Sequence, residues 1–271
     1  MQSNIPFMAL ESHPAHLGFA SLQTEIEQVL NIRIELCHQW NHRGSDLLHP
    51  DRCLKIVQQF AAQIQVKNLT CAGSMLIKYW AVPLLYPYFY SVLLNKPHMP
   101  WALDKVVLDL NASWAWDRVL KLNLDAEFEQ NMQSPPSDPV AFFQIIFSDL
   151  NEVFEVLGRV AKVPKILLWE NTALRILQFY DLMARRQISA ECLARIKAQR
   201  ASLQMLYADD FGLAKNPFKQ LFDAWSNRQQ CYQRQKCCFY FQLPEAAHDY
   251  CKNCPLQQRS KLREKHQCKH L

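Results

Sequence analysis

Four cysteines lie within eighteen residues of this 271-residue chain: the adjacent Cys237 and Cys238, then, after twelve residues, Cys251 and Cys254 in a Cys-x-x-Cys loop. Such a loop lets two sulfurs converge on one metal, in zinc sites and iron-sulfur clusters alike. Zinc ribbons separate paired ligands by two to four residues, so the adjacent pair favours a wider two-iron cluster. Adjacent side chains diverge, so the chain must turn between Cys237 and Cys238 if both reach one centre. Structural zinc and a thiol redox switch are the alternatives.

The other cysteines have simpler interpretations. A disulfide between Cys237 and Cys238 would be strained, because adjacent Cα atoms lie about 3.8 Å apart and bridged cysteines usually lie further apart. The two cysteines nearest the cluster are predicted to be bystanders, and those inside helical apolar patterns are predicted to be small core residues. The first group is Cys231 and Cys268; the second is Cys37, Cys53, Cys71 and Cys192.

The composition, 49% hydrophobic, is sufficient for a sizeable core. The N-terminus lacks a basic stretch followed by an apolar run, so we expect no export signal and a cytoplasmic location. The longest uncharged run lies between Lys78 and Lys96 and includes Pro83 and Pro87. It is shorter than the roughly 20 apolar residues of a membrane span. We interpret it as a buried helix pair, with membrane contact at most peripheral.

Hydrophobic periodicity predicts a mainly α fold. Asp138 followed by Pro139 predicts a helix start, because the carboxylate caps free amides and proline suits the first helical position. The β-rich run 105–110 and a weak alternation over 114–120 predict a small β-hairpin near 105–120, turning at 111–113. We expect a helical domain over 15–225 and a cysteine module over 226–271. The predicted helices are 21–41, 51–65, 139–157, 165–185, 189–206 and 217–230.

Several enzyme classes lack sequence support. The five glycines form neither GxGxxG nor a phosphate-binding loop, which disfavours nucleotide-cofactor folds. The sequence has no H-E-x-x-H and no G-x-S-x-G, which are the motifs of zinc proteases and α/β-hydrolases. The clustered cysteines are therefore the strongest candidates for reactivity.

Positive charge is concentrated in the cysteine-bearing end. Residues 228–271 hold nine Lys or Arg and three acidic residues, a charge of +6, which leaves −1 for residues 1–227 of the total +5. This end suits an acidic electron-donor protein or an anionic ligand. Residues 257–271 contain no aromatic residue, so we expect no nucleic-acid role.

Two further groups of residues are weaker candidates. His38 and His42 would lie one turn apart at the end of the first predicted helix, which carries its apolar stripe over 21–41 and ends near Gly44. This spacing can bind a metal, although a solvated or hydrogen-bonded pair is more common. Trp169, Glu170 and Asn171 either contribute to a substrate pocket or lie at an ordinary domain interface.

Cys237-Cys238-Phe239-Tyr240-Phe241 and the later segment 251–256 together resemble the C-terminal iron-sulfur motif of FhuF-type siderophore-iron reductases. That motif pairs adjacent cysteines with a downstream Cys-x-x-Cys. A weaker likeness extends over 73–85 and 168–174. The gap between the cysteine pairs is ten residues in the family and twelve here.

This resemblance implies a cytoplasmic protein in which Cys237, Cys238, Cys251 and Cys254 hold a [2Fe-2S] cluster. It implies one-electron reduction of the Fe(III) of an imported, often hydroxamate-type, ferric siderophore. The basic C-terminal tail suits a ferredoxin- or flavodoxin-type electron donor. Hard oxygen ligands hold Fe(III) more tightly than Fe(II), so reduction releases the iron. The alternative function is a zinc-stabilised interaction protein with a basic C-terminal tail.

Overall fold

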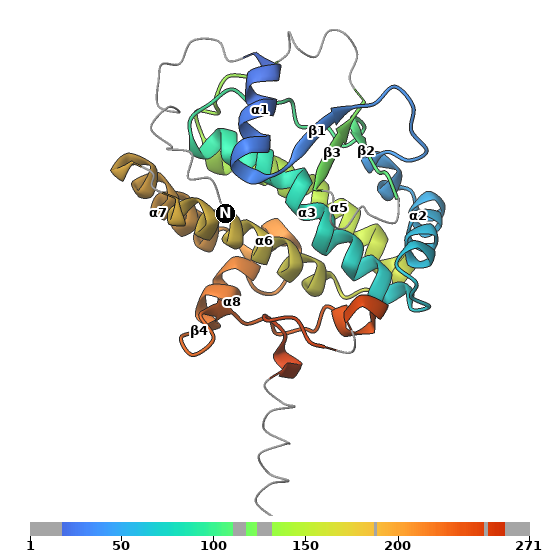
Figure 1. The fold of residues 1–271 in the computed structure, drawn as a ribbon. Helices are drawn as coiled ribbons and strands as arrows, with labels where there is room; N and C mark the ends of the chain where they lie inside the picture. The colour runs from blue at the N-terminus through green and yellow to red at the C-terminus, as the bar shows by residue number, and fades with distance from the viewer. Residues whose placement is uncertain (1–17, 111–117, 124–131, 187–188, 247–248, 258–271) are drawn as a thin grey trace, which may run out of the picture.

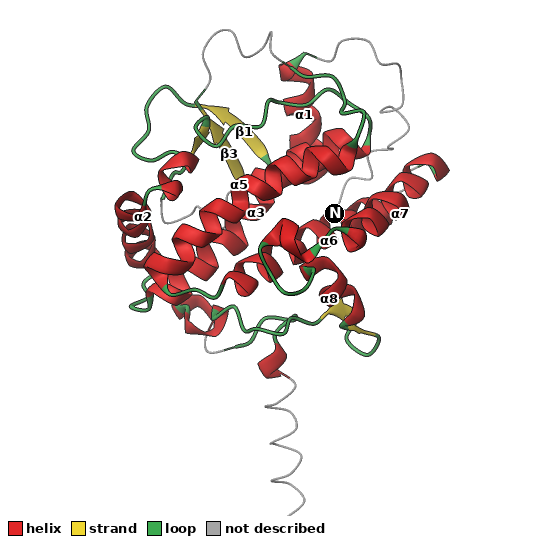
Figure 2. Ribbon diagram, turned by 180° about the vertical axis from the view of Figure 1, so that it is seen from behind, coloured by secondary structure: helices red, strands yellow, loops and turns green. Residues whose placement is uncertain are grey.

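The computed structural model describes residues 18–110, 118–123, 132–186, 189–246 and 249–257. Helices dominate these ranges, and a small sheet packs on one side of them (Figures 1 and 2). The C-terminal segment that carries the clustered cysteines runs along the opposite side from the sheet, beneath α6 and one end of α3 (Figure 1). The mainly α prediction is confirmed.

The centre of the fold is a pair of helices, α3 (Leu69–Leu93) and α6 (Lys165–Arg185), which lie side by side in both views (Figures 1 and 2). Helices α2 (Pro50–Gln63) and α5 (Pro139–Ala161) pack against α3. Phe89 of α3 stacks on Phe143 of α5 with ring centroids 4.2 Å apart. Burial of such rings is the main stabilising contribution to a helical core.

Helix α3 corrects the prediction of a helix pair, because it runs through both Pro83 and Pro87 without a break. Proline inside a helix removes a backbone hydrogen bond and costs about 3 kcal/mol. Burial offsets that cost here, since α3 is buried on nearly all sides by neighbouring elements. Within the described ranges no helix, α3 included, has the length and apolar character that crossing a membrane requires.

The predicted helix over 21–41 is correct only in its first part. Helix α1 spans Phe19–Leu30 and ends at Asn31, which adopts a left-handed conformation with φ 53°. Strand β1 (Arg33–Leu36) follows. Ile32 and Ile34 are buried while Arg33 points to solvent, so the period of two predicts the strand better than helical spacing does.

The small sheet has the strand order β1-β3-β2. Strands β2 (Val106–Val107) and β3 (Val119–Leu122) pair antiparallel, with Val106 opposite Leu122, as the predicted hairpin requires. The predicted turn at 111–113 lies outside the described residues. Strand β1 adds a parallel partner to β3, with Arg33 opposite Val119, in a segment for which a helix was predicted.

The remaining helices mostly follow the predicted ranges. Asp138 caps α5 by accepting hydrogen bonds from the backbone N–H groups of Val140 and Ala141, as predicted. Helix α7 spans Ala190–Met205. Helix α8 (Pro217–Asp223) is shorter than the predicted 217–230, because β4 (Trp225–Ser226) and β5 (Cys231–Tyr232) form an antiparallel pair there. Short 3-10 turns lie at Gly44–Leu48, Ala208–Phe211, Tyr240–Gln242 and Pro244–Ala246.

Candidate metal centre

The structure brings the four clustered cysteines together as two pairs. Each pair joins one of the adjacent cysteines to one cysteine of the Cys-x-x-Cys loop, and we call this arrangement the crosswise pairing. The sulfur of Cys238 lies 3.7 Å from that of Cys251, and the sulfur of Cys237 lies 3.5 Å from that of Cys254. The divergence of adjacent side chains therefore sends Cys237 and Cys238 to different members of the Cys-x-x-Cys loop. Both separations are far longer than the roughly 2.0 Å of a disulfide.

Local turns present these sulfurs. The N–H of Cys254 donates to the carbonyl of Cys251 at 2.9 Å, which closes the Cys-x-x-Cys loop. Asn253 holds this loop against the preceding strand pair, because its side-chain amide donates to the carbonyl of Tyr232 at 2.7 Å. After the adjacent cysteines, Phe239 takes a left-handed conformation with φ 66°, and its N–H donates to the sulfur of Cys237 at 3.4 Å.

The site has a buried and a more exposed side. Cys238 and Cys254 are each 1% exposed, whereas Cys237 and Cys251 are half-buried. Hydrogen bonding with Cys251, together with burial, raises the pKa of Cys238 to about 12. Hydrogen bonding with Cys254 lowers the pKa of Cys237. A metal binds thiolates, so binding here would displace the proton that Cys238 holds at neutral pH.

Two residues of α6 anchor the segment that precedes the cysteines. Glu170 is fully buried, and its carboxylate accepts the backbone N–H of Gln235 at 2.8 Å and that of Lys236 at 3.0 Å. Asn171 accepts a hydrogen bond from Arg234. Burial raises the pKa of Glu170, although the two N–H donors and the Arg234 charge act in the opposite direction.

Helix α3 provides the second anchor. The hydroxyl of Ser74 donates to the carbonyl of Cys238 at 3.1 Å, and the side-chain amide of Asn171 donates to both oxygens of Ser74 at 3.1 Å. The thiol of Cys71, one turn earlier, donates to the carbonyl of Phe239 at 3.5 Å. The cysteine segment therefore rests on a polar network that joins α3 to α6.

Arg234 is the charged residue closest to the sulfurs and is only 2% exposed. One terminal nitrogen donates to the sulfur of Cys238 at 2.9 Å and to that of Cys251 at 2.7 Å, and the other donates to Asn171. Burial opposes its charge, but negative charge on Cys238 and Cys251 raises the pKa of Arg234 above its ordinary value.

Lys78 is a second cation near the sulfurs and is 8% exposed. Its ammonium lies 4.4 Å from the ring centroid of Tyr240 and 5.4 Å from that of Tyr79. No carboxylate among the described residues forms an ion pair with it. Burial lowers the pKa of Lys78, while charge on Cys238 and Cys251 acts in the opposite direction.

The four sulfurs were predictable from the sequence, but the residues that hold them were not. A pocket and an interface were the two alternatives for Trp169, Glu170 and Asn171. In the structure all three are buried, and Glu170 and Asn171 contact the cysteine segment. Arg234 and Lys78 gave no sequence signal beyond their charge.

The other sequence candidates contribute no sulfur or nitrogen to the two sulfur pairs. His38 and His42 are on no helix, so their predicted spacing of one turn is wrong, and His42 contacts the side chain of Gln59 at 2.5 Å. Cys231 is buried and accepts from the side-chain amide of Gln233 at 3.1 Å. Cys53, Cys71 and Cys192 are buried and Cys37 half-buried. Cys268 and the tail 258–271 lie outside the described residues.

Among the residues that the structure describes, no group of three or more His, Cys, Asp or Glu side chains has an arrangement that could hold a metal ion. The sulfurs form the two close pairs given above, and the side chains of Cys251 and Cys254 are also hydrogen-bonded to each other. A tetrahedral metal with bonds of about 2.3 Å to sulfur holds two sulfurs about 3.8 Å apart. Each pair therefore has the spacing of two ligands on one metal, whereas the convergence of three or four ligands on a single ion is not seen in the described ranges.

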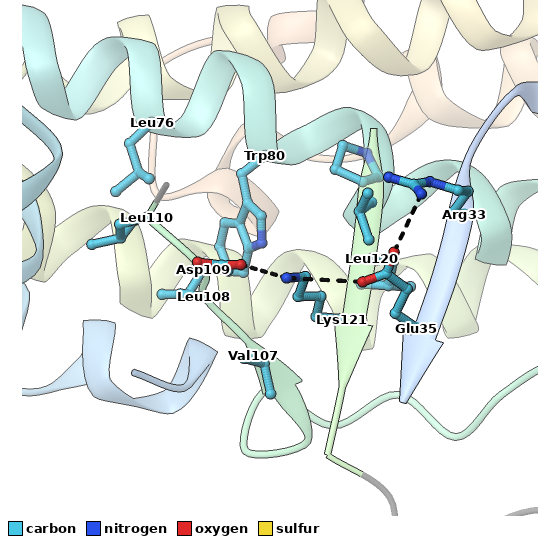
Figure 3. Close-up of a pocket in the computed structure, with 12 residues that line it drawn as sticks. Arg33, Glu35, Leu76, Trp80, Val107, Leu108, Asp109, Leu110, Leu120 and Lys121 are labelled. Carbon is cyan, nitrogen blue, oxygen red and sulfur yellow. Dashed lines mark hydrogen bonds and ion pairs between the residues drawn. The ribbon is translucent and has the colours of Figure 1, made fainter. Parts of the chain in front are cut away.

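A pocket of about 140 Å³ lies between the sheet and α3. Its polar wall is a charge row in which Lys121 contacts Asp109 and Glu35, and Glu35 contacts Arg33, while Trp80 of α3 covers the opposite wall (Figure 3). Pockets for drug-sized ligands usually measure about 300 to 1,000 Å³. This one is too small for such a ligand, and none of the four clustered cysteines lines it.

No family model matches the sequence, and no curated protein matches it.

Proposed function

We propose that Cys237, Cys238, Cys251 and Cys254 hold a [2Fe-2S] cluster and that this chain is a ferric-siderophore reductase. The observation that carries the proposal is the crosswise pairing of the sulfurs at 3.7 and 3.5 Å. A two-iron cluster needs two ligands on each iron, and two close pairs supply them. A single zinc ion needs all its ligands around one point.

The surroundings of the sulfurs favour a redox centre. The cluster with four thiolates carries net negative charge, and the buried guanidinium of Arg234 supplies a counter-charge on the protein side. Cys237 and Cys251 are half-buried, so an electron has a short path between this edge and a partner outside. The cluster, when bound, supplies one-electron chemistry; the chain holds it, shields one side from water and sets its charge environment.

The proposed substrate is an anionic or oxygen-rich Fe(III) chelate that approaches the edge near Cys251. Lys78 and the rings of Tyr79 and Tyr240 place positive charge and aromatic surface near that edge. One electron passes from a ferredoxin- or flavodoxin-type donor to the chelated Fe(III), and Fe(II) then leaves its hard oxygen ligands. A cytoplasmic location suits this chemistry, because thiol ligands and Fe(II) persist in a reducing compartment.

Iron analysis and a reduction assay test the proposal. Protein purified anaerobically should contain about two irons and two sulfides per chain and show visible sulfur-to-iron absorption bands. The pre-reduced protein should reduce ferric hydroxamate chelates, whereas Cys251→Ala should lose both iron and activity. Cys37→Ser, a half-buried cysteine outside the cluster, is the matched control and should retain both. A colourless, zinc-loaded protein would instead support the zinc-stabilised interaction protein.

A further inference from the structure

Arg234 carries a buried positive charge. No acidic side chain among the described residues forms an ion pair with it, since the carboxylate of nearby Glu170 accepts backbone N–H groups instead. Its Nε is also buried without a hydrogen-bond partner in the described ranges. A buried guanidinium is costly unless a negative group compensates it. The sulfurs of Cys238 and Cys251 are the groups that its terminal nitrogen contacts.

The position of this guanidinium is fixed from its far side. Asn171 accepts from the other terminal nitrogen, and Asn171 is itself held by Ser74 of α3. The backbone N–H of Arg234 donates to the carbonyl of Asn253, inside the Cys-x-x-Cys loop, at 3.1 Å. The guanidinium therefore cannot move away from the sulfurs without breaking the buried hydrogen bonds through Asn171.

The guanidinium of Arg234 contacts one of the two sulfur pairs directly. Arg234 donates to Cys238 and Cys251, and the charge of Lys78 also acts on these two sulfurs. In the other pair, the sulfur of Cys237 accepts the neutral backbone N–H of Phe239. Hydrogen bonds to cluster sulfurs, and positive charge near them, are among the factors that set a cluster's reduction potential.

We infer that Arg234 is a positioning residue that stabilises added negative charge at the Cys238 and Cys251 pair and so raises the reduction potential of the site. This inference rests on the proposed function. The electron that arrives from the reduced donor protein adds one negative charge, and the fixed guanidinium makes that charge less costly. No bond is formed or broken at Arg234, and its proton stays in place.

The test is a redox titration followed by visible absorbance on iron-loaded protein, with iron content measured in parallel. Arg234→Gln removes the charge and is expected to shift the potential to a lower value. Arg234→Lys keeps a positive charge without the planar fork and is expected to cause a smaller shift. Lys236→Gln is the matched control, because it removes one charge from an exposed position two residues away. It should leave the potential almost unchanged.

Equal potentials for Arg234→Gln and Lys236→Gln would overturn the inference, as would equal shifts for Arg234→Gln and Arg234→Lys. Should Arg234→Gln fail to hold iron, Arg234→Lys and Asn171→Ala decide the matter, because Asn171→Ala releases the guanidinium but keeps its charge. Arg234→Lys and Asn171→Ala should each have a lower reduction potential than Lys236→Gln. If neither variant shifts the potential, the inference about Arg234 is wrong. Absence of iron from the wild-type protein refutes the proposed function, whereas an iron-loaded reductase that is insensitive to Arg234 refutes this inference alone.

Discussion

The hydroxyl of Ser74 donates a hydrogen bond of 3.1 Å to the carbonyl oxygen of Cys238, across 164 residues of sequence. Cys238 is buried, so its carbonyl must find a donor inside the protein. Ser74 is itself held by the side-chain amide of Asn171. One hydroxyl thus links the central helix pair to the backbone that directly follows the adjacent cysteines.

Ser74→Ala should therefore destabilise the protein. It leaves the buried carbonyl of Cys238 without a donor, which costs about 1 to 3 kcal/mol in the free energy of unfolding. Ser202→Ala is the control, because the Ser202 hydroxyl donates to Ala198 in an exposed turn of α7. That change should cost less than about 0.5 kcal/mol. Urea unfolding of both variants checks the difference, and equal costs would show that the link to Cys238 is not stabilising.

Glu170 gives a prediction for the pH dependence of stability. Burial raises its pKa above the ordinary value of 4.5, so the folded state binds this proton more tightly than the unfolded state. The stabilisation is fully present below pH 4.5 and is lost as the pH rises through the folded-state pKa. Glu170→Gln removes this dependence. The amide also accepts only one of the two N–H groups of Gln235 and Lys236, which costs about 1 to 3 kcal/mol.

The measurement is the free energy of unfolding of wild-type protein and of Glu170→Gln between pH 4 and 8, by urea titration at each pH. The margin by which the wild type is more stable should be greatest at the acidic end and should narrow as the pH rises. A margin that widens with pH would mean that the folded state favours the carboxylate, contrary to the direction inferred from burial.

The sequence predicted those features that depend on local chemistry. The capping carboxylate of Asp138 and the four sulfurs were visible because their roles follow from residue type and spacing. Local spacing failed at Asn31. The apolar pattern over 21–41 fits a helix, but Asn31 adopts a left-handed conformation and ends α1 there. Pro83 and Pro87 predicted a break that burial prevented. In both places tertiary packing decided between local alternatives.

The residues that support the sulfurs could not be predicted from the sequence, for a different reason. Glu170 meets Gln235, and Ser74 meets Cys238, across sequence separations of 65 and 164 residues. A polar residue on an apolar helix carries no information about which distant backbone group it will satisfy. No motif or spacing in the sequence indicated these contacts.

Gly73 lies where α3 packs closely against the C-terminal end of α5 and the residues that follow it. A Cβ at this position would lie 2.9 Å from Cγ2 of Val163 and 3.2 Å from Cβ of Ala161. Alanine favours a helix over glycine by about 1 kcal/mol, yet overpacking costs about 1 to 3 kcal/mol. We expect Gly73→Ala to lower the free energy of unfolding by up to about 2 kcal/mol.

A double-mutant cycle identifies the cause. Val163→Ala removes the methyl group that the new Cβ meets first, so Gly73→Ala should cost less in that background than in the wild type. Thermal or urea unfolding of the four proteins gives the interaction free energy. An unchanged cost in the Val163→Ala background would assign the effect to something other than this close approach.

Removal of iron should change the reactivity of the cysteines selectively. Burial raises the pKa of Cys53 and of Cys71 to about 12, so both should resist alkylation at pH 8 whether or not iron is present. Cys237 and Cys251 are half-buried and should be protected only while their sulfurs bind metal. After treatment with a chelator and a reductant, both should react, and mass spectrometry of the digested protein locates the label. Equal labelling of Cys251 before and after iron removal would mean that this sulfur is not a ligand. The two sulfur pairs could then not be interpreted as the ligands of a two-iron cluster.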